Sequence, residues 1–160
     1  MPKDSHSEFR TVRGYQKLNQ QAGQLTPALE DYLEMVFRCC ETNKYTRVGK
    51  IAELLNVTPS SASKMVFKLT NLGYLKYEQR EIILLTDSGR EAGAFLLKRH
   101  NTIERFFKLI GIRDSLEETE LVEHSLNRHT VKHLEVLLNF FKESPSTANN
   151  LNEFQKKALR

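Results

Sequence analysis

Apolar residues recur every three or four positions through most of this chain, which is the spacing of helices that each bury one face. The first firm pattern begins at Thr26-Pro27, a hydroxyl cap followed by a proline that fits the first helical position, and it runs to about residue 41. A second pattern covers residues 46–55 and ends at Asn56, a residue that tolerates a left-handed turn. Thr58-Pro59 predicts another helix, which runs to about residue 72 and stops at Gly73.

Strand-like runs at residues 74–78 and 82–86 come next and predict a short hairpin with residues 79–81 at its tip. A long helix is then predicted from about residue 87 to 110, and a capping box formed by Ser115 and Glu118 starts a shorter one. A broad apolar face predicts a last firm helix over residues 129–143, and a face so wide needs two partners, one of them a second subunit. Helix, turn, helix and hairpin form a winged helix-turn-helix, so the chain is expected to be mostly α with a small two-stranded wing.

The predicted helix over residues 59–72 has a polar face suited to DNA. Small hydroxyls and lysines can point outward from it: Ser60, Ser61, Ser63, Lys64 and Lys68. Residues 57–77 contain no acid, so this surface suits a phosphate-flanked major groove. The alternative is a three-helix packing unit whose basic face is merely solvated.

Charge separates the two halves of the chain, whose net charge is +4. Residues 41–100 hold ten Lys/Arg against six acids, whereas residues 101–143 hold six against eight, so only the first half suits nucleic acid. No apolar run long enough to span a membrane and no signal peptide is visible, and a cytoplasmic protein is therefore expected. Cys39 and Cys40 are adjacent and predict reduced, packed thiols rather than a disulfide framework; a redox role is the less favoured alternative.

Carboxylates and histidines recur at one-turn spacing on three of the predicted helices. Asp31 and Glu34 lie one turn apart on the first. Glu120, Glu123 and His124 project from one face of the helix that starts near residue 115. His100 lies at the margin of an apolar stripe. Taken separately, Asp31 and Glu34 are better explained as a solvated face, and His100 as a structural residue. Glu120, Glu123 and His124 fit a metal site and a solvated face equally well. His129 and His133 also share a face, but no acid cluster joins them, so a metal site there is only weakly indicated.

Residues 26–141 resemble the diphtheria toxin repressor family, and within it the manganese transport regulator branch. The residues that carry the resemblance are Glu30-Asp31-Tyr32-Leu33-Glu34, Arg47-Val48 with Ile51-Ala52, Val57-Thr58-Pro59-Ser60-Ser61 with Lys64-Met65-Val66, Leu85-Thr86 with Gly89, Arg99-His100, and Glu120-Leu121-Val122-Glu123-His124. No single piece is specific, but the joint match is.

The resemblance implies a metal site between a winged domain and a helical dimerisation domain. Its ligands would be Asp31, Glu34, His100, Glu120, Glu123 and His124. The iron-responsive branch has a sulfur ligand at the position of Asp31 and a cysteine at that of Glu120, and this chain has neither. An oxygen-rich shell without thiolates suits Mn²⁺, with Fe²⁺ as the second candidate, and the family implies two ions per subunit.

Four regions follow from the pattern and the resemblance together. They are a flexible N-terminal arm (1–24), a winged helix-turn-helix DNA-binding domain (25–90), a helical metal-binding and dimerisation domain (91–145) and a polar C-terminal tail with at most one short helix (146–160). The SH3-like domain of the iron-responsive branch is not expected. The long arm departs from the family pattern.

The function implied is that of a transcriptional regulator, not an enzyme. We expect a homodimer that represses metal-uptake genes by binding double-stranded operator DNA when loaded with Mn²⁺, with no membrane and no organic ligand involved. The DNA-binding residues would be Arg47, Ser60, Ser61, Ser63, Lys64, Lys68 and Arg80. The expected mechanism is that Asp31 and Glu34 repel Glu120 and Glu123 until metal links them. Alternatives are an iron-responsive member of the family, a helical-bundle metalloenzyme or a winged-helix sensor of an organic ligand.

Overall fold

The computed structural model describes residues 11–159, which form helices and one small sheet. Residues 1–10 of the predicted arm lie outside the described residues. The elements are α1 (Val12–Gln21), α2 (Pro27–Asn43), β1 (Thr46–Arg47), α3 (Val48–Leu54), α4 (Pro59–Asn71), β2 (Leu75–Glu78), a 3₁₀ turn (Gln79–Glu81), β3 (Ile82–Leu85), α5 (Asp87–Leu109), α6 (Leu116–Glu123), α7 (Arg128–Glu143) and α8 (Pro145–Ala158).

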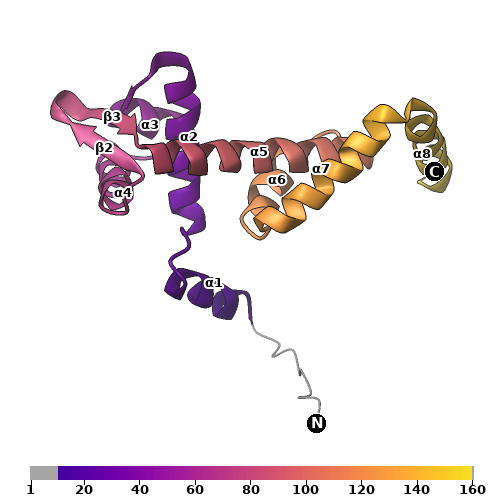
Figure 1. The fold of residues 1–160 in the computed structure, drawn as a ribbon, viewed down its shortest axis with the longest axis horizontal. Coiled ribbons are helices and arrows are strands. Elements are labelled where there is room, and N and C mark those ends of the chain that lie inside the picture. The colour runs from indigo at the N-terminus through magenta and orange to yellow at the C-terminus, as the bar shows by residue number, and fades with distance from the viewer. Residues whose placement is uncertain (1–10, 160) are drawn as a thin grey trace, which may run out of the picture.

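A winged helix-turn-helix occupies one end of the molecule, where α2, α3 and α4 pack against the sheet (Figure 1). The hairpin is present as predicted, but the sheet has three strands in the order β1-β3-β2. Thr46 and Arg47 were predicted to begin a helix; instead they pair with Ile83 and Ile82 of β3. Burial of Thr46 and its ladder bonds outweigh the helical pattern there. The core beneath is apolar and includes Leu33, Val36, Ile51, Ala62, Val66, Leu69 and Ile83.

Side-chain caps fix where three of these helices begin. The hydroxyls of Thr26, Thr58 and Thr86 accept hydrogen bonds from the backbone N–H groups of Leu29, Ser61 and Gly89. Each such cap stabilises a helix by about 1 kcal/mol. The capping box predicted at Ser115 is wrong in one detail, because α6 starts there without a side-chain cap bond and Ser115 is buried instead.

The long helix α5 connects the winged unit to the second helical layer formed by α6 and α7 (Figure 1). It packs most extensively on α2, and the crossing is close. A Cβ at Gly93 would lie 2.6 Å from Cβ of Phe37, so only glycine fits there without a shift. This close contact places one turn of α2 beside the first third of α5, and α6 also packs on α5.

Helices also form near both ends of the described chain. Residues 12–21, predicted as part of a flexible arm, form α1, which lies apart from the packed layers and has no buried residue (Figure 1). The hydroxyl of Thr11 caps α1 by accepting a hydrogen bond from Gly14 N. The polar composition of this segment did not indicate that local bond. The polar tail forms α8, which is longer than the short helix expected. Within residues 11–159, no helix is both long and apolar enough to cross a membrane.

Candidate metal centre and DNA-binding surface

Three helices bring carboxylates and imidazoles to a single cavity of about 1100 Å³. Helix α2 contributes Asp31 and Glu34, which one-turn spacing places on the same face. His100 comes from the middle of α5. Glu123 ends α6, and His124 is its C-cap residue. Packing of α5 on both α2 and α6 therefore assembles groups that are up to 93 positions apart in the sequence, from Asp31 to His124.

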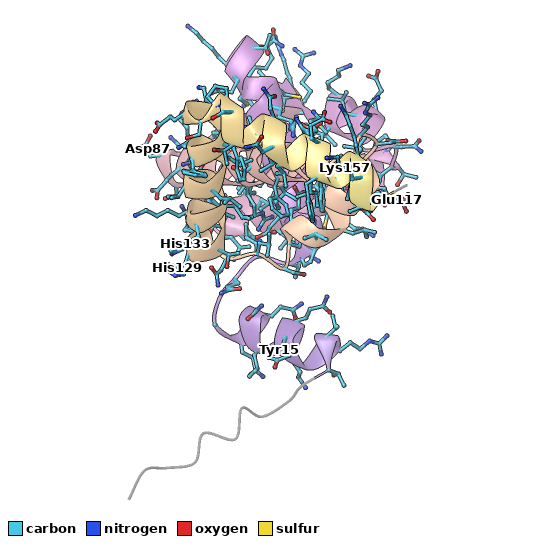
Figure 2. The ribbon with its side chains drawn as sticks, turned by 90° about the vertical axis from the view of Figure 1, so that its right-hand side faces the viewer. Tyr15, Asp87, Glu117, His129, His133 and Lys157 are labelled. Carbon is cyan, nitrogen blue, oxygen red and sulfur yellow. The ribbon has the colours of Figure 1, made fainter. Side chains whose placement is uncertain are left out.

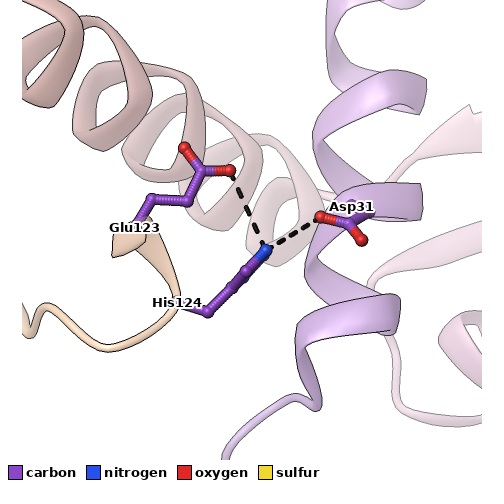
Figure 3. A group of neighbouring side chains, drawn as sticks. All are labelled: Asp31, Glu123 and His124. Carbon is purple, nitrogen blue, oxygen red and sulfur yellow. Dashed lines mark ion pairs between the residues drawn. The ribbon is translucent and has the colours of Figure 1, made fainter. Parts of the chain in front are cut away.

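These residues form two groups with the spacing of metal ligands. One is Asp31, Glu123 and His124, and the other is Glu34, His100 and Glu123; within each group the donor atoms lie within 4.8 Å of one another. Figure 3 shows the first group, with the side chain of His124 between those of Asp31 and Glu123. Because Glu123 belongs to both groups and has two oxygens, it can bridge neighbouring cations. Glu34 and Glu123 are buried, whereas Asp31 is half exposed.

Glu120, the sixth residue expected to bind metal, is placed differently. It lines the same cavity, but it is exposed and belongs to neither group. It lies one turn before Glu123 on α6, so its side chain is on the face that borders the cavity. The structure thus gathers five of the six predicted residues closely and leaves the sixth at the rim.

The two histidines at the cavity, His100 and His124, have raised pKa values because they face carboxylates. His100 Nδ1 lies 2.9 Å from Glu123 Oε2, and this hydrogen bond is the main reason its pKa is raised. For His124, burial lowers the pKa, but hydrogen bonds with Asp31 and Glu30 outweigh burial and raise it to about 9. His124 is therefore an imidazolium near neutral pH, with Nε2 3.1 Å from Asp31 Oδ1 and Nδ1 2.7 Å from Glu30 Oε2.

Glu30 and Arg99 form a supporting pair that was not predicted as part of the site. Arg99 is only 3% exposed and donates to Glu30 Oε2 over 2.7 Å. The same oxygen faces His124 Nδ1, so Glu30 joins α2, α5 and α6 at one point. Burial opposes ionisation of Glu30, but hydrogen bonds from His124 and Arg99 lower its pKa. The sequence offered one indication of this pair: each residue directly precedes a predicted ligand, Glu30 before Asp31 and Arg99 before His100.

Arg38 also lines the cavity, and it was not predicted as part of the site. It lies one turn after Glu34 on α2, and its Nε and Nη2 donate to Glu34 Oε1 over 2.9 and 2.6 Å. Among the described residues that line the cavity, it is the one arginine or lysine.

The donors fit a hard divalent cation. Each group offers carboxylate oxygens and one imidazole, and no sulfur. Cys40 is buried in the apolar core, and burial raises its pKa to about 11, so it remains a thiol. His129 and His133 are exposed on α7 (Figure 2), with ring centroids 4.4 Å apart in an edge-to-face arrangement. Within residues 11–159 no third ligand joins this pair.

The polar face of α4 is exposed, as its pattern indicated. Ala62, Val66 and Leu69 are buried against the core, which turns the opposite face to solvent. The residues expected to bind DNA are all exposed: Arg47, Ser60, Ser61, Ser63, Lys64, Lys68 and Arg80. Arg80 lies at the wing tip with a left-handed backbone (φ 60°). Ser61 Oγ already accepts a hydrogen bond from Thr58 at the start of the helix.

Two family descriptions match successive parts of the chain. Residues 24–82 match "Iron dependent repressor, N-terminal DNA binding domain", and residues 86–151 match "Iron dependent repressor, metal binding and dimerisation domain". The boundary between the two matches falls in residues 83–85, immediately before α5.

Individual proteins agree with these matches. The chain is 37% identical over 135 residues to the HTH-type transcriptional regulator MntR of Oceanobacillus iheyensis, covering 83% of this chain and 92% of that protein. It is also 37% identical over 134 residues to MntR of Bacillus subtilis, covering 82% and 94%. The solved structure of the manganese regulator SloR is similar with a TM-score of 0.63 and 28% identity, over 72% of this chain; the chain spans about half (55%) of that protein.

Proposed function

Because this chain belongs to the iron-dependent (diphtheria toxin) repressor family, and so is a metal-dependent DNA-binding transcriptional regulator rather than an enzyme, we propose that it is a manganese-responsive repressor. It binds operator DNA as a homodimer when each subunit holds two Mn²⁺ ions. The likeness to the MntR proteins and to the manganese regulator SloR supports the choice of metal. Fe²⁺ is the competing metal, and the test below includes it.

The observation that carries the proposal is the pair of ligand groups that share Glu123. Asp31 and Glu34 belong to α2 of the winged unit, while Glu123 and His124 belong to α6. A cation bound to either group would attract side chains of both helices, α2 and α6, and so link the winged unit to the second helical layer. Glu120, at the rim of the cavity, is the additional carboxylate that we assign to the same site. We therefore assign the metal role to Asp31, Glu34, His100, Glu120, Glu123 and His124.

The residues at the junction also place positive charge beside its acids. Repulsion between the acids of α2 and α6 was expected to keep the two layers apart. In the structure each acid of α2 already faces a cation, since His124 lies against Asp31 and Arg38 lies against Glu34. The positive charges of the His124 imidazolium and the Arg38 guanidinium thus offset the repulsion between the acids. To hold a metal through Nε2, His124 would lose the proton at that nitrogen and keep the one at Nδ1, which would donate to Glu30.

DNA recognition follows from the position of α4. A dimer must present its two α4 helices about one turn of DNA apart, so the angle between the winged unit and α5 decides whether both fit successive major grooves. Lys64, Lys68 and Arg80 would contact phosphates. Base edges and the adjacent backbone would be contacted by Ser60, Ser61, Ser63 and Arg47, which are exposed. Exposed apolar residues on α7, among them Val136 and Phe140, are the surface we assign to the second subunit.

Titration of metal-free protein with each cation tests this function. Calorimetry with Mn²⁺ is expected to give two ions per subunit, followed by tighter binding to DNA. Equal titrations with Fe²⁺ under anaerobic conditions distinguish the two metals, since the one that activates DNA binding at the lower free concentration is the regulator's metal. Absence of uptake of either cation at micromolar concentration would overturn the proposal.

A further inference from the structure

We propose that Arg38 is a built-in competitor of the metal: its guanidinium occupies Glu34 in the metal-free protein and sets the metal concentration at which the group of Glu34, His100 and Glu123 is filled. This inference rests on the proposed metalloregulatory function. It concerns the threshold of the site, and it adds a residue that is neither a ligand nor part of the DNA-binding surface.

The contacts of Arg38 define this role. Two of its nitrogens, Nε and Nη2, donate to the same atom, Glu34 Oε1, over 2.9 and 2.6 Å. Hydrogen bonds between charged partners are roughly twice as strong as neutral ones. The side chain of Glu34 is 10% exposed, so water contributes little to stabilising its carboxylate, and the Arg38 guanidinium is the cation paired with it. A cation that binds Glu34 through this oxygen must displace both hydrogen bonds.

Arg38 can leave Glu34 without becoming an unpaired buried charge. Its side chain is 39% exposed, unlike that of Arg99, which is 3% exposed. Arg38 can therefore turn toward solvent, and its displacement from Glu34 is reversible.

The two ligand groups consequently differ in the barrier that each presents to a cation. Both contain a histidine that lies against a carboxylate. Among the described residues, an arginine pairs with a ligand carboxylate in the Glu34 group, whereas the half-exposed Asp31 faces no arginine. In the Asp31 group, Arg99 lies 3.4 Å from His124 Nδ1 but pairs with Glu30, which is not a ligand. Arg38 makes uptake at the Glu34 group the more demanding step. A regulator built in this way responds fully only when metal is abundant.

Replacement of Arg38 by methionine tests the inference, because methionine keeps the helix and the apolar stem but has no charge. Mn²⁺ binding to metal-free protein is measured by calorimetry, and thermal unfolding is measured with chelator present. Arg90→Met is the matched control. Arg90 also pairs with an acid of α2, Glu41, at 3.7 Å, but both side chains are more than half exposed and neither lines the cavity. Arg38→Lys, which keeps the charge but cannot donate from two nitrogens in the same fork, is the conservative variant.

The weaker of the two Mn²⁺ affinities is expected to rise by at least about tenfold in Arg38→Met, since two charge-assisted hydrogen bonds no longer compete with it. Arg38→Met is also expected to unfold at a lower temperature than the parent in chelator, because Glu34 then lacks its partner. Arg38→Lys should lie between parent and Arg38→Met, and Arg90→Met should bind like the parent. If Arg38→Met and the parent bind Mn²⁺ identically, Arg38 is not a competitor. If the parent takes up no Mn²⁺, the proposed function itself fails, and the two failures are therefore distinguishable.

Discussion

Replacement of Glu30 by alanine should destabilise the metal-free protein more than replacement of almost any exposed acid. Glu30 accepts a hydrogen bond from Arg99 Nη2 over 2.7 Å and lies 2.7 Å from His124 Nδ1. Its removal leaves the guanidinium of Arg99, which is 3% exposed, without a carboxylate. Orphaning a buried charge in this way costs about 3–5 kcal/mol. For a chain of this size, that corresponds to a fall of roughly 10 °C in the unfolding midpoint.

Urea denaturation followed by circular dichroism, with chelator present and protein concentrations held equal, measures this cost. Glu53→Ala is the control, since Glu53 pairs with Lys50 at 3.1 Å on the surface and the pair is worth about 1 kcal/mol or less. The double variant Glu30→Ala, Arg99→Met is expected to recover part of the loss, because the buried charge is then gone too. A loss in Glu30→Ala no larger than that in Glu53→Ala would refute the reasoning.

Three further outcomes are expected. His100→Ala should weaken Mn²⁺ uptake in calorimetry while leaving the circular dichroism spectrum unchanged, because His100 lies at the cavity and not in the apolar core; undiminished uptake would exclude it as a ligand. In urea denaturation, the metal-free protein should lose stability as pH rises from 6.5 to about 9, because His124 has a higher pKa in the folded protein than in the unfolded chain. Its stabilising effect is complete below pH 6.5 and is lost as pH passes the folded pKa of about 9. Mn²⁺ affinity should increase over the same range by up to about tenfold per pH unit, as His124 loses its proton; a flat pH profile of both stability and affinity would contradict the assignment. The double variant Lys64→Ala, Lys68→Ala should bind DNA more weakly and reduce the slope of log affinity against log salt by about two, one for each lysine, in titrations at several salt concentrations; an unchanged slope would show that neither lysine contacts phosphate.

Helix positions were predictable because their start signals are local. Thr26, Thr58 and Thr86 each cap a helix from the position that the sequence indicated. Start signals that depend on burial were less predictable. Ser115 has the capping-box sequence and precedes α6, but it lies buried and makes no side-chain cap bond. The next helix, α7, does have such a bond, because the side chain of Asn127 accepts a hydrogen bond from Thr130 N. The strand at Thr46-Arg47 was missed because its hydrogen-bond partner, β3, is more than thirty residues away in the sequence.

The candidate ligands could be inferred from the sequence only by joining residues on different helices through a family resemblance. Periodicity places Asp31 beside Glu34 and Glu120 beside Glu123 and His124, but it cannot show that α2 and α6 face one cavity. The supporting residues were less accessible still. Glu30 and Arg99 act through a contact between residues 69 positions apart. Arg38 is only four positions from Glu34, yet on an isolated helix that pair would be an ordinary surface ion pair; burial of Glu34 gives it a different role.

The central claim is that metal at the junction of α2, α5 and α6 controls DNA binding by α4. Fluorescence anisotropy tests it most directly, using a labelled duplex enriched from random sequences by repeated selection on Mn²⁺-treated protein. The affinity for this duplex is measured with buffered Mn²⁺ and again with chelator, and an unselected duplex serves as the control. The account predicts that Mn²⁺ strengthens binding to the selected duplex by about 5- to 150-fold, the range of a typical allosteric coupling, and has little effect on the control. Equal affinity for the selected duplex with Mn²⁺ and with chelator would contradict it.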